Sequence, residues 1–357
     1  MFVVREVKKI YKRFVPERWR YFIGKALDSI LVRDEAVCLG DLNPRKTFYV
    51  IRIAGQKWGA LSTWINLMPF VLYGLKKKYI PIIDLKNITP PELLCDTESV
   101  GKNNCWDLYF KQPQNNFSLN EILCSRRVVF ASWRNVDVEK YKKIRDCDLP
   151  LRNKDYKLLK KMNKFCPVSN DIVSYAETLK DKLFPKNEKI LAVSYRRAFE
   201  WSHYCQLDFT PPGTHLVRGD VHSVFSEIRK FLYENDYNYF FFMVDDRETL
   251  ELAKEQFKNS CIFIERCMPH YFSNGVPVLQ DDYNTIHIEF GKRENDVYLN
   301  AKEYLAGVYL MSKCDSFLSC GGSADVVTYV MNDKKFEKIV QLEGKGDVVK
   351  HASDGKR

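Results

Sequence analysis

Short apolar runs alternate with helical patterns along most of the chain, and this alternation predicts an α/β protein. Residues 48–53 form an apolar strand, and a glycine-bearing turn, GQKWGAL, follows it. A helical pattern from Ser62 to Lys77 comes next, and YIPIIDL is a second strand. A strand, a helix and another strand in this order predict a βαβ unit. Such a unit opens a doubly wound domain with its turn at the carboxyl end of the first strand.

A second series of strands and helices begins near residue 190. Its expected strands are ILAVSY, YFFFMVDD, CIFIER and SFLS, and the helical patterns between them are VHSVFSEIRKFLYEN, RETLELAKEQF and NDVYLNAKEYLAGVYLMSKC. The turn CGGSA and a last helix, DVVTYVMND, follow. We therefore predict two Rossmann-like domains that face each other across a cleft, with ligands at the carboxyl ends of the strands.

Changes in composition divide the chain into four parts. A basic segment covers residues 1–45, a first α/β domain covers 46–185, a second covers 186–345, and the tail covers 346–357. The first domain ends in charged helical patterns, and the last of these, SNDIVSYAETLKDKL, has Ser169 or the next residue available as its N-cap. FPKNEK is the expected linker between the domains.

The charge of the chain is unevenly distributed. The net charge is +10, and residues 1–25 hold eight Lys or Arg but only two acidic residues. No nucleic-acid-binding motif accompanies these cations, so we expect no nucleic-acid partner. Basic and apolar residues alternate there at helical spacing, which leaves two interpretations open. The segment either lies on an anionic membrane surface or packs on its own domain with a solvated basic face.

Cysteine and histidine patterns bear on the compartment and on metals. The eleven cysteines include no C-x-x-C pair, and the six histidines have no metal-ligand spacing. This favours reduced thiols in a cytoplasmic protein without a metal site. A D-x-D match at 146–148 follows a helical pattern and is discounted as a metal motif. With no signal peptide or membrane span evident, we expect a cytoplasmic protein, either free or peripheral on the inner face of the membrane.

Three features fall at the carboxyl ends of strands in the second domain, where such sheets bind ligands. Small residues before a helix let the backbone approach a phosphate, and the amides of the first helical turn point at it. Arginine adds a fixed fork of donors that suits phosphate oxygens. Together they suggest a diphosphate clamp, although each has an ordinary structural explanation, such as an inter-domain salt bridge. The three features are Ser194-Tyr195-Arg196-Arg197, Asp245-Asp246 and Cys320-Gly321-Gly322-Ser323.

The acidic pair admits two interpretations. Asp245 and Asp246 could bind a ribose hydroxyl or a base edge, and Asp246 could instead cap the following helix.

Taken in order, the segments SYRRAF, FMVDDRETL and LMSKCDSFLSCGGSA resemble motifs of the GDP-fucose-dependent fucosyltransferases, the α1,6- and nodulation fucosyltransferase group. KWGALSTW, IPIIDL and PPGTH are similar to further motifs of a bacterial branch of that superfamily found in surface-polysaccharide synthesis. The resemblance spans about residues 48–345.

This resemblance implies a GT-B fold and inverting, metal-independent transfer of a sugar from a nucleotide-sugar donor, with a GDP-sugar favoured and no other cofactor. The acceptor would be a glycan or a lipid-linked glycan. The domain at 46–185 would bind the acceptor, and that at 186–345 the donor. By position, Arg196 would hold the β-phosphate and stabilise the departing diphosphate. The other implied donor-binding residues are Ser194, Arg197, His215, Asp245, Asp246, Gly321, Gly322 and Ser323, and the implied cleft or acceptor residues are Gly59, Ser62 and Glu200.

Three positions depart from the family pattern. Ser194 replaces its leading His, Phe199 replaces its motif-ending Asp, and Gly307 stands where an Asp reads guanine. Guanine, fucose and catalysis itself are therefore open, and the alternative is a catalytically inactive relative that binds a nucleotide sugar or glycan. Glu200 is the carboxylate nearest the arginines, but no residue identifies itself as the general base.

Overall fold

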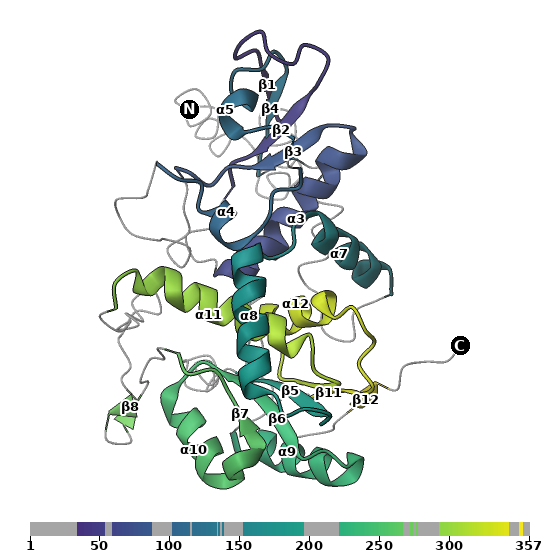
Figure 1. Ribbon diagram of the computed structural model, residues 1–357. Helices are drawn as coiled ribbons and strands as arrows, with labels where there is room; N and C mark the ends of the chain where they lie inside the picture. The colour runs from purple at the N-terminus through teal and green to yellow at the C-terminus, as the bar shows by residue number, and fades with distance from the viewer. Residues whose placement is uncertain are drawn as a thin grey trace, which may run out of the picture.

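The computed structural model of the protein shows two α/β units at its two ends, with helices between them (Figure 1). It describes residues 34–53, 59–87, 102–114, 116–133, 135, 138, 153–195, 221–266, 272–273, 276–277, 293–342 and 350–352. Residues 1–25, which hold most of the cations of the basic segment, and the motif at 146–148 lie outside these residues.

The N-terminal unit contains a four-stranded sheet in the order β1-β4-β2-β3. Strands β2, β3 and β4 are parallel, and β1 runs antiparallel at the edge beside β4. The fully buried β2 reaches β3 through a helix, α3, that is buried on most of its surface, so the predicted βαβ unit is confirmed. The bounds are β1 Glu35–Val37, β2 Phe48–Ile51, α3 Ala60–Lys76, β3 Ile80–Ile83 and β4 Val128–Phe130.

The described residues of the first half of the chain form four further helices. They are α4 (Trp106–Tyr109), α5 (Leu119–Ile122), α7 (Asn153–Phe165) and α8 (Asn170–Leu183). Ser169 is the N-cap of α8, as predicted, although its hydroxyl donates to the carbonyl of Leu108 at 3.1 Å instead of accepting from the helix.

The C-terminal unit is built on a six-stranded sheet in the order β12-β11-β10-β5-β6-β7. The first strand in sequence, β5, lies between β10 and β6, so the strand order reverses between β5 and β10. Such a reversal is a topological switch point, where open α/β sheets bind their ligands. The bounds are β5 Ile190–Tyr195, β6 Tyr239–Val244, β7 Cys261–Ile262, β10 Ser316–Ser319, β11 Ile339–Gln341 and the antiparallel edge strand β12 Lys350–Ala352.

Helices cover both faces of this sheet. Residues of α9 and α10 pack into one apolar cluster, and those of α11 and α12 pack into another. The predicted fold class, α/β with two Rossmann-like units of mainly parallel strands, is confirmed. The bounds are α9 Val221–Asn235, α10 Arg247–Phe257, η4 Lys258–Ser260, α11 Asp296–Met311 and α12 Ser323–Met331, and β8 (Phe272–Ser273) pairs with β9 (Val276–Pro277) as a separate two-stranded sheet.

The two units are joined through α3, α7, α8, α11 and α12, which lie between the sheets (Figure 1). One apolar cluster includes residues of both units, among them Trp64 of α3 and Leu305 of α11. Lys160 of α7 also donates to the carbonyl of Asn332, just after α12, at 2.8 Å. Because α8 packs along α11 of the other unit, helices from the first half of the chain support the second sheet.

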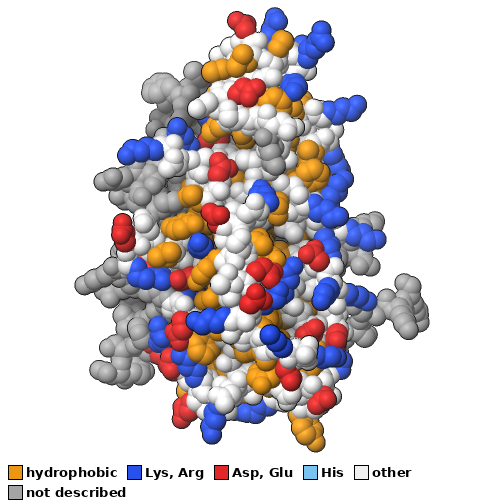
Figure 2. All heavy atoms as spheres, in the orientation of Figure 1, with side chains coloured by type: hydrophobic (Ala, Val, Ile, Leu, Met, Phe, Trp, Pro, Cys, Tyr) orange, Lys and Arg blue, Asp and Glu red, His pale blue; other side chains and the backbone are white. Residues whose placement is uncertain are grey.

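The surface mixes charges of both signs. Lys and Arg side chains gather along the edge of the view in Figure 2 where Figure 1 places α7, whose described part carries Lys157, Lys160, Lys161 and Lys164. Basic character therefore extends beyond residues 1–25. No helix in the described ranges is long and apolar enough to cross a membrane.

Gly307 on α11 lies directly against β6. A Cβ atom at this position would be 2.3 Å from Sδ of Met243, a buried residue of β6. The position therefore faces the interior, and any side chain there requires the flexible end of Met243 to move. A carboxylate at this position would be buried against a thioether, which is costly.

We expect Gly307→Ala to lower the free energy of unfolding by about 1 kcal/mol, because overpacking against Met243 outweighs the gain in helix propensity. Met243→Ala alone leaves a cavity and should also destabilise the protein, by about 2–5 kcal/mol. In the double variant the new methyl group occupies space that Met243 has vacated, so its cost should be clearly less than the sum. Chemical denaturation of the four proteins measures this coupling, and strictly additive costs would contradict the contact.

Candidate functional site

The carboxyl ends of β5 and β10 form the centre of the candidate site. These strands pair in register, with Ser194 opposite Ser319, and both serines are buried. After β10 the chain turns through Gly321 and Gly322 into α12, which begins at Ser323. The turn with the helix start and the end of β5, two of the three predicted donor-side features, thus meet at the switch point.

The two glycines are required by the backbone conformation. Gly321 has φ 95°, and Gly322 has φ 124° and ψ 175°, a region that only glycine adopts readily. A Cβ atom at Gly322 would meet nothing within 4 Å, so the turn has an open side. The backbone here can be approached closely by a ligand, as the sequence predicted for a phosphate.

Asp325, in the first turn of α12, lies behind this turn and is only 1% exposed. Its Oδ2 accepts hydrogen bonds from the hydroxyl of Ser319 and, at 2.8 Å, from the N–H of Gly321. Burial raises the pKa of this carboxyl, while the hydroxyls of Ser319 and Ser194 and the amides of Gly321 and Cys320 act in the opposite direction. The carboxyl therefore connects the strand ends with the turn.

Helix α3 of the N-terminal unit meets α12 at the same place. The hydroxyls of Ser62, in the first turn of α3, and Ser323, the first residue of α12, are 3.1 Å apart. Gly59 is the N-cap of α3. The partly positive N-terminal ends of two helices, one from each unit, thus converge, and such ends attract anions. The structure brings together Gly59, Ser62 and Ser323, which the sequence placed on opposite sides of a cleft.

The acidic pair follows β6. Asp246 is fully buried and its Oδ1 accepts a hydrogen bond from the N–H of Thr249 at 2.8 Å, so the predicted capping of α10 is confirmed. Asp245 is half-buried at the end of the strand, next to Asp246. A role of either residue in donor binding stays a prediction.

Several predicted residues lie outside the described part of the chain. These are Arg196, Arg197, Phe199, Glu200 and His215. Arg196 is the next residue in sequence after Tyr195, which ends β5. Among the described residues no group of three or more His, Cys, Asp or Glu side chains is arranged to hold a metal ion.

Two further groups at carboxyl strand ends were missed by sequence reasoning. In the N-terminal unit, Arg52 after β2 donates to Asp84 after β3 at 2.6 Å and lies over the ring of Phe130, at the end of β4, at 4.7 Å. Asp84 lies in IPIIDL, one of the motifs that the sequence had already singled out, whereas its pairing with Arg52 could not be predicted. In the C-terminal unit, Arg266 after β7 donates to the carbonyl of Val244 at the end of β6.

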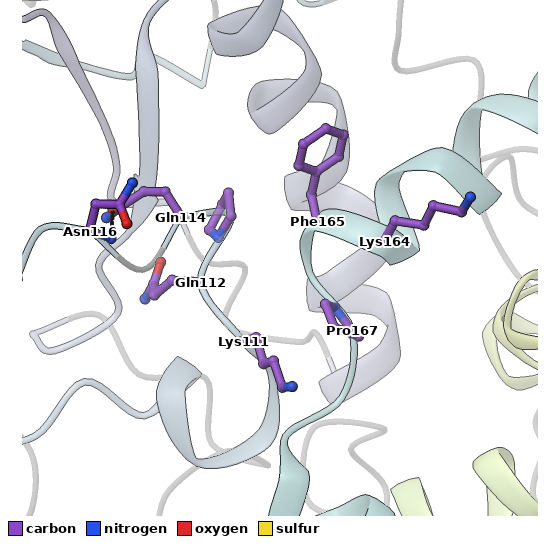
Figure 3. A pocket seen from close by; sticks show the side chains of 8 residues that line it. Lys111, Gln112, Gln114, Asn116, Lys164, Phe165 and Pro167 are labelled. Atoms are coloured by element: carbon purple, nitrogen blue, oxygen red, sulfur yellow. Dashed lines mark hydrogen bonds between the residues drawn. The ribbon is translucent and has the colours of Figure 1, made fainter.

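The N-terminal unit also contains a pocket of about 370 Å³ (Figure 3). Its amide side chains already bind the protein: Gln112 pairs with both the N–H and the carbonyl of Ile83, each at 2.9 Å, and Gln114 accepts from the N–H groups of Asn116 and Phe117. None of the predicted site residues lines it, so we do not place the functional site there. The lining residues are Lys111, Gln112, Pro113, Gln114, Asn116, Lys164, Phe165 and Pro167.

Comparison with known proteins finds similarity to solved structures alone. No family model and no curated protein matches the chain. The chain is similar to fucosyltransferase NodZ from Bradyrhizobium, with 11% identity, a TM-score of 0.49, and coverage of 86% of this chain and 98% of that one. NodZ α-1,6-fucosyltransferase co-crystallised with GDP has 11% identity, a TM-score of 0.47, and coverage of 83% and 95%. POFUT1 in complex with GDP-fucose has 10% identity, a TM-score of 0.46, and coverage of 85% and 99%. The function proposed below therefore rests on the geometry of the site and not on these similarities.

We expect Arg52→Met to lower the free energy of unfolding by about 1–2 kcal/mol, because Asp84, which is 3% exposed, then loses its cation, while the 36% exposure of Arg52 lets water offset part of the loss. Replacing both residues, Arg52→Met with Asp84→Asn, should recover part of this loss by removing the charge as well. Urea denaturation at neutral pH tests both statements, and a single variant as stable as the parent would show that the ion pair contributes nothing.

Proposed function

We propose that the protein is a glycosyltransferase that moves a sugar from a nucleotide-sugar donor to a glycan or lipid-linked acceptor. The observation that carries this proposal is the convergence of α3 and α12 at the switch point, marked by the 3.1 Å contact between Ser62 and Ser323. A diphosphate bound there meets helix N-termini from both units, an open glycine turn and two hydroxyl donors.

Because the N-terminal unit can hold an acceptor beside the diphosphate, the site is suited to group transfer as well as to anion binding. In sugar transfer the acceptor hydroxyl forms a bond to the anomeric carbon as the bond from that carbon to the diphosphate oxygen breaks. The diphosphate leaves with the electron pair, and the acceptor loses its proton to a base. The first turn of α12 and Arg196 would stabilise the charge that develops on the leaving diphosphate. The N-terminal unit would place the acceptor on the other side of the anomeric carbon, which gives inversion of configuration.

The sequence motifs limit which nucleobase and which sugar the donor is expected to carry. GDP is the first nucleotide to test, because the motifs resemble those of GDP-fucose-dependent enzymes. Any recognition of guanine must use groups other than residue 307, since Gly307 packs against Met243. We propose no metal for the reaction, and Glu200 is the first carboxylate to test as the base. We propose that such an enzyme acts in the cytoplasm, in the synthesis of a cell-surface polysaccharide or glycoconjugate.

A thermal-shift panel with GDP, UDP, CDP and their sugars tests the donor class. We expect one nucleotide to stabilise the wild-type protein preferentially. Arg196→Ala should abolish this response. Ser323→Asp should also abolish it, because the added carboxylate repels phosphate, while the same charge at the start of α12 leaves the melting temperature unchanged or slightly raised.

The matched control is Asn170→Asp, which adds the same charge at the exposed first residue of α8 and should keep the full response. An undiminished response in Ser323→Asp would show that the phosphates bind elsewhere. Release of the nucleoside diphosphate when acceptor extract is added then distinguishes an enzyme from a protein that only binds the donor.

The basic segment supports a second proposal, that residues 1–25 attach the protein to an anionic membrane surface. Eight cations beside apolar residues give it both charge and hydrophobic attraction to such lipids. We expect deletion of residues 1–25 to weaken sedimentation with phosphatidylserine-containing liposomes, and raised salt to weaken that of the intact protein. Equal sedimentation of both proteins would assign the segment to packing on its own domain.

A further inference from the structure

Asp325 makes more contacts than an ordinary acidic residue at a helix start. As the third residue of α12 it is placed to reach back toward the N-cap, Gly322, as in a capping box. Its Oδ2 instead binds the N–H of Gly321, one residue before the cap, at 2.8 Å, and the hydroxyl of Ser319 in β10. The hydroxyl of Ser194 in β5 also acts on it. One side chain thus connects a helix, a turn and the strand β10 by hydrogen bonds, next to the end of β5.

Capping alone does not require this arrangement. A carboxylate that is 1% exposed is costly to bury, and burial raises its pKa accordingly. A serine at the same place could accept from one amide without that cost. The benefit of the carboxylate is that a single oxygen receives donors from the strand and from the turn, which fixes where Gly321 lies relative to β10.

We infer that Asp325 is a positioning residue for the diphosphate site, holding the Gly321–Gly322 turn so that its open side and the first residue of α12 face the donor. The inference rests on the proposed function, since it assumes that phosphates bind at this turn. Both glycines have positive φ angles, 95° and 124°. Glycine adopts these angles without strain but adopts many others equally well, so contacts such as these select this conformation.

The negative charge of Asp325 distinguishes two possible roles, an electrostatic effect on the ligand and positioning of the glycine turn. A negative charge behind a phosphate site repels the ligand, so any favourable effect of Asp325 must come from geometry. Asparagine with its amide oxygen at the position of Oδ2 can accept from both Gly321 and Ser319, but it carries no charge. Alanine removes both contacts. Positioning therefore predicts that Asp325→Asn restores what Asp325→Ala loses.

The experiment measures the affinity of the full-length protein for GDP, or for whichever nucleoside diphosphate gives the largest thermal shift, by titration calorimetry. Asp325→Ala should weaken binding about tenfold or more, the size expected for lost hydrogen bonds to a charged group. Asp325→Asn should stay within about threefold of the wild type, and Ser319→Ala should lie between them. Thr328→Val is the control, because this buried residue is on the same helix, one turn further on, and should change stability but not affinity.

Hydrogen exchange of the Gly321 amide gives a readout that needs no ligand, with faster exchange expected in Asp325→Ala and not in Thr328→Val. If the wild type binds and Asp325→Ala binds equally well, the inference is wrong. It is also wrong if Asp325→Asn falls as far as alanine, since asparagine can keep both hydrogen bonds that the inference holds responsible for the affinity. If the wild type binds no nucleotide, the proposed function fails, while unchanged exchange at Gly321 would independently remove the positioning role. Should Asp325→Ala not fold, Ser319→Ala carries the same comparison.

Discussion

The pairing of β5 with β10 is the constraint on which the rest of the site depends. These strands are far apart in sequence, and their parallel register sets Ser194 opposite Ser319 at one edge of the sheet. Because strand order reverses between them, the helices that follow, α9 and α12, leave on opposite faces of the sheet. The glycine turn and α12 therefore lie at the carboxyl ends of the two strands, where open α/β sheets bind their ligands.

The N-terminal unit completes the site with the N-terminal end of α3. Neither the start of α3 nor the start of α12 would by itself identify a binding site, since many helices begin with glycine and serine. Their meeting at Ser62 and Ser323 places two helix N-termini from separate sheets at one point. This convergence needs the apolar cluster shared by the two units, which fixes α3 against α12.

Local pattern predicted the main elements well. The strands around 190–195 and 316–319 and the helices at 221–235 and 247–257 match the observed elements, because long apolar runs and 3.6-residue periodicity are strong signals. The short strands β1, β4, β11 and β12 were not predicted. Each has only three residues, too few for a periodic pattern, and each forms because a neighbouring strand supplies its hydrogen bonds.

The sequence by itself determined the α/β class, the two units, the cap at Asp246 and the glycine turn, because each depends on a pattern within a few residues. Only the tertiary structure decided that Asp325 lies behind that turn, that Arg52 pairs with Asp84, and that Gly307 must admit Met243. Those contacts join residues far apart in the chain or on different elements. The packing of strands and helices decides which of them meet, and no local pattern records that choice.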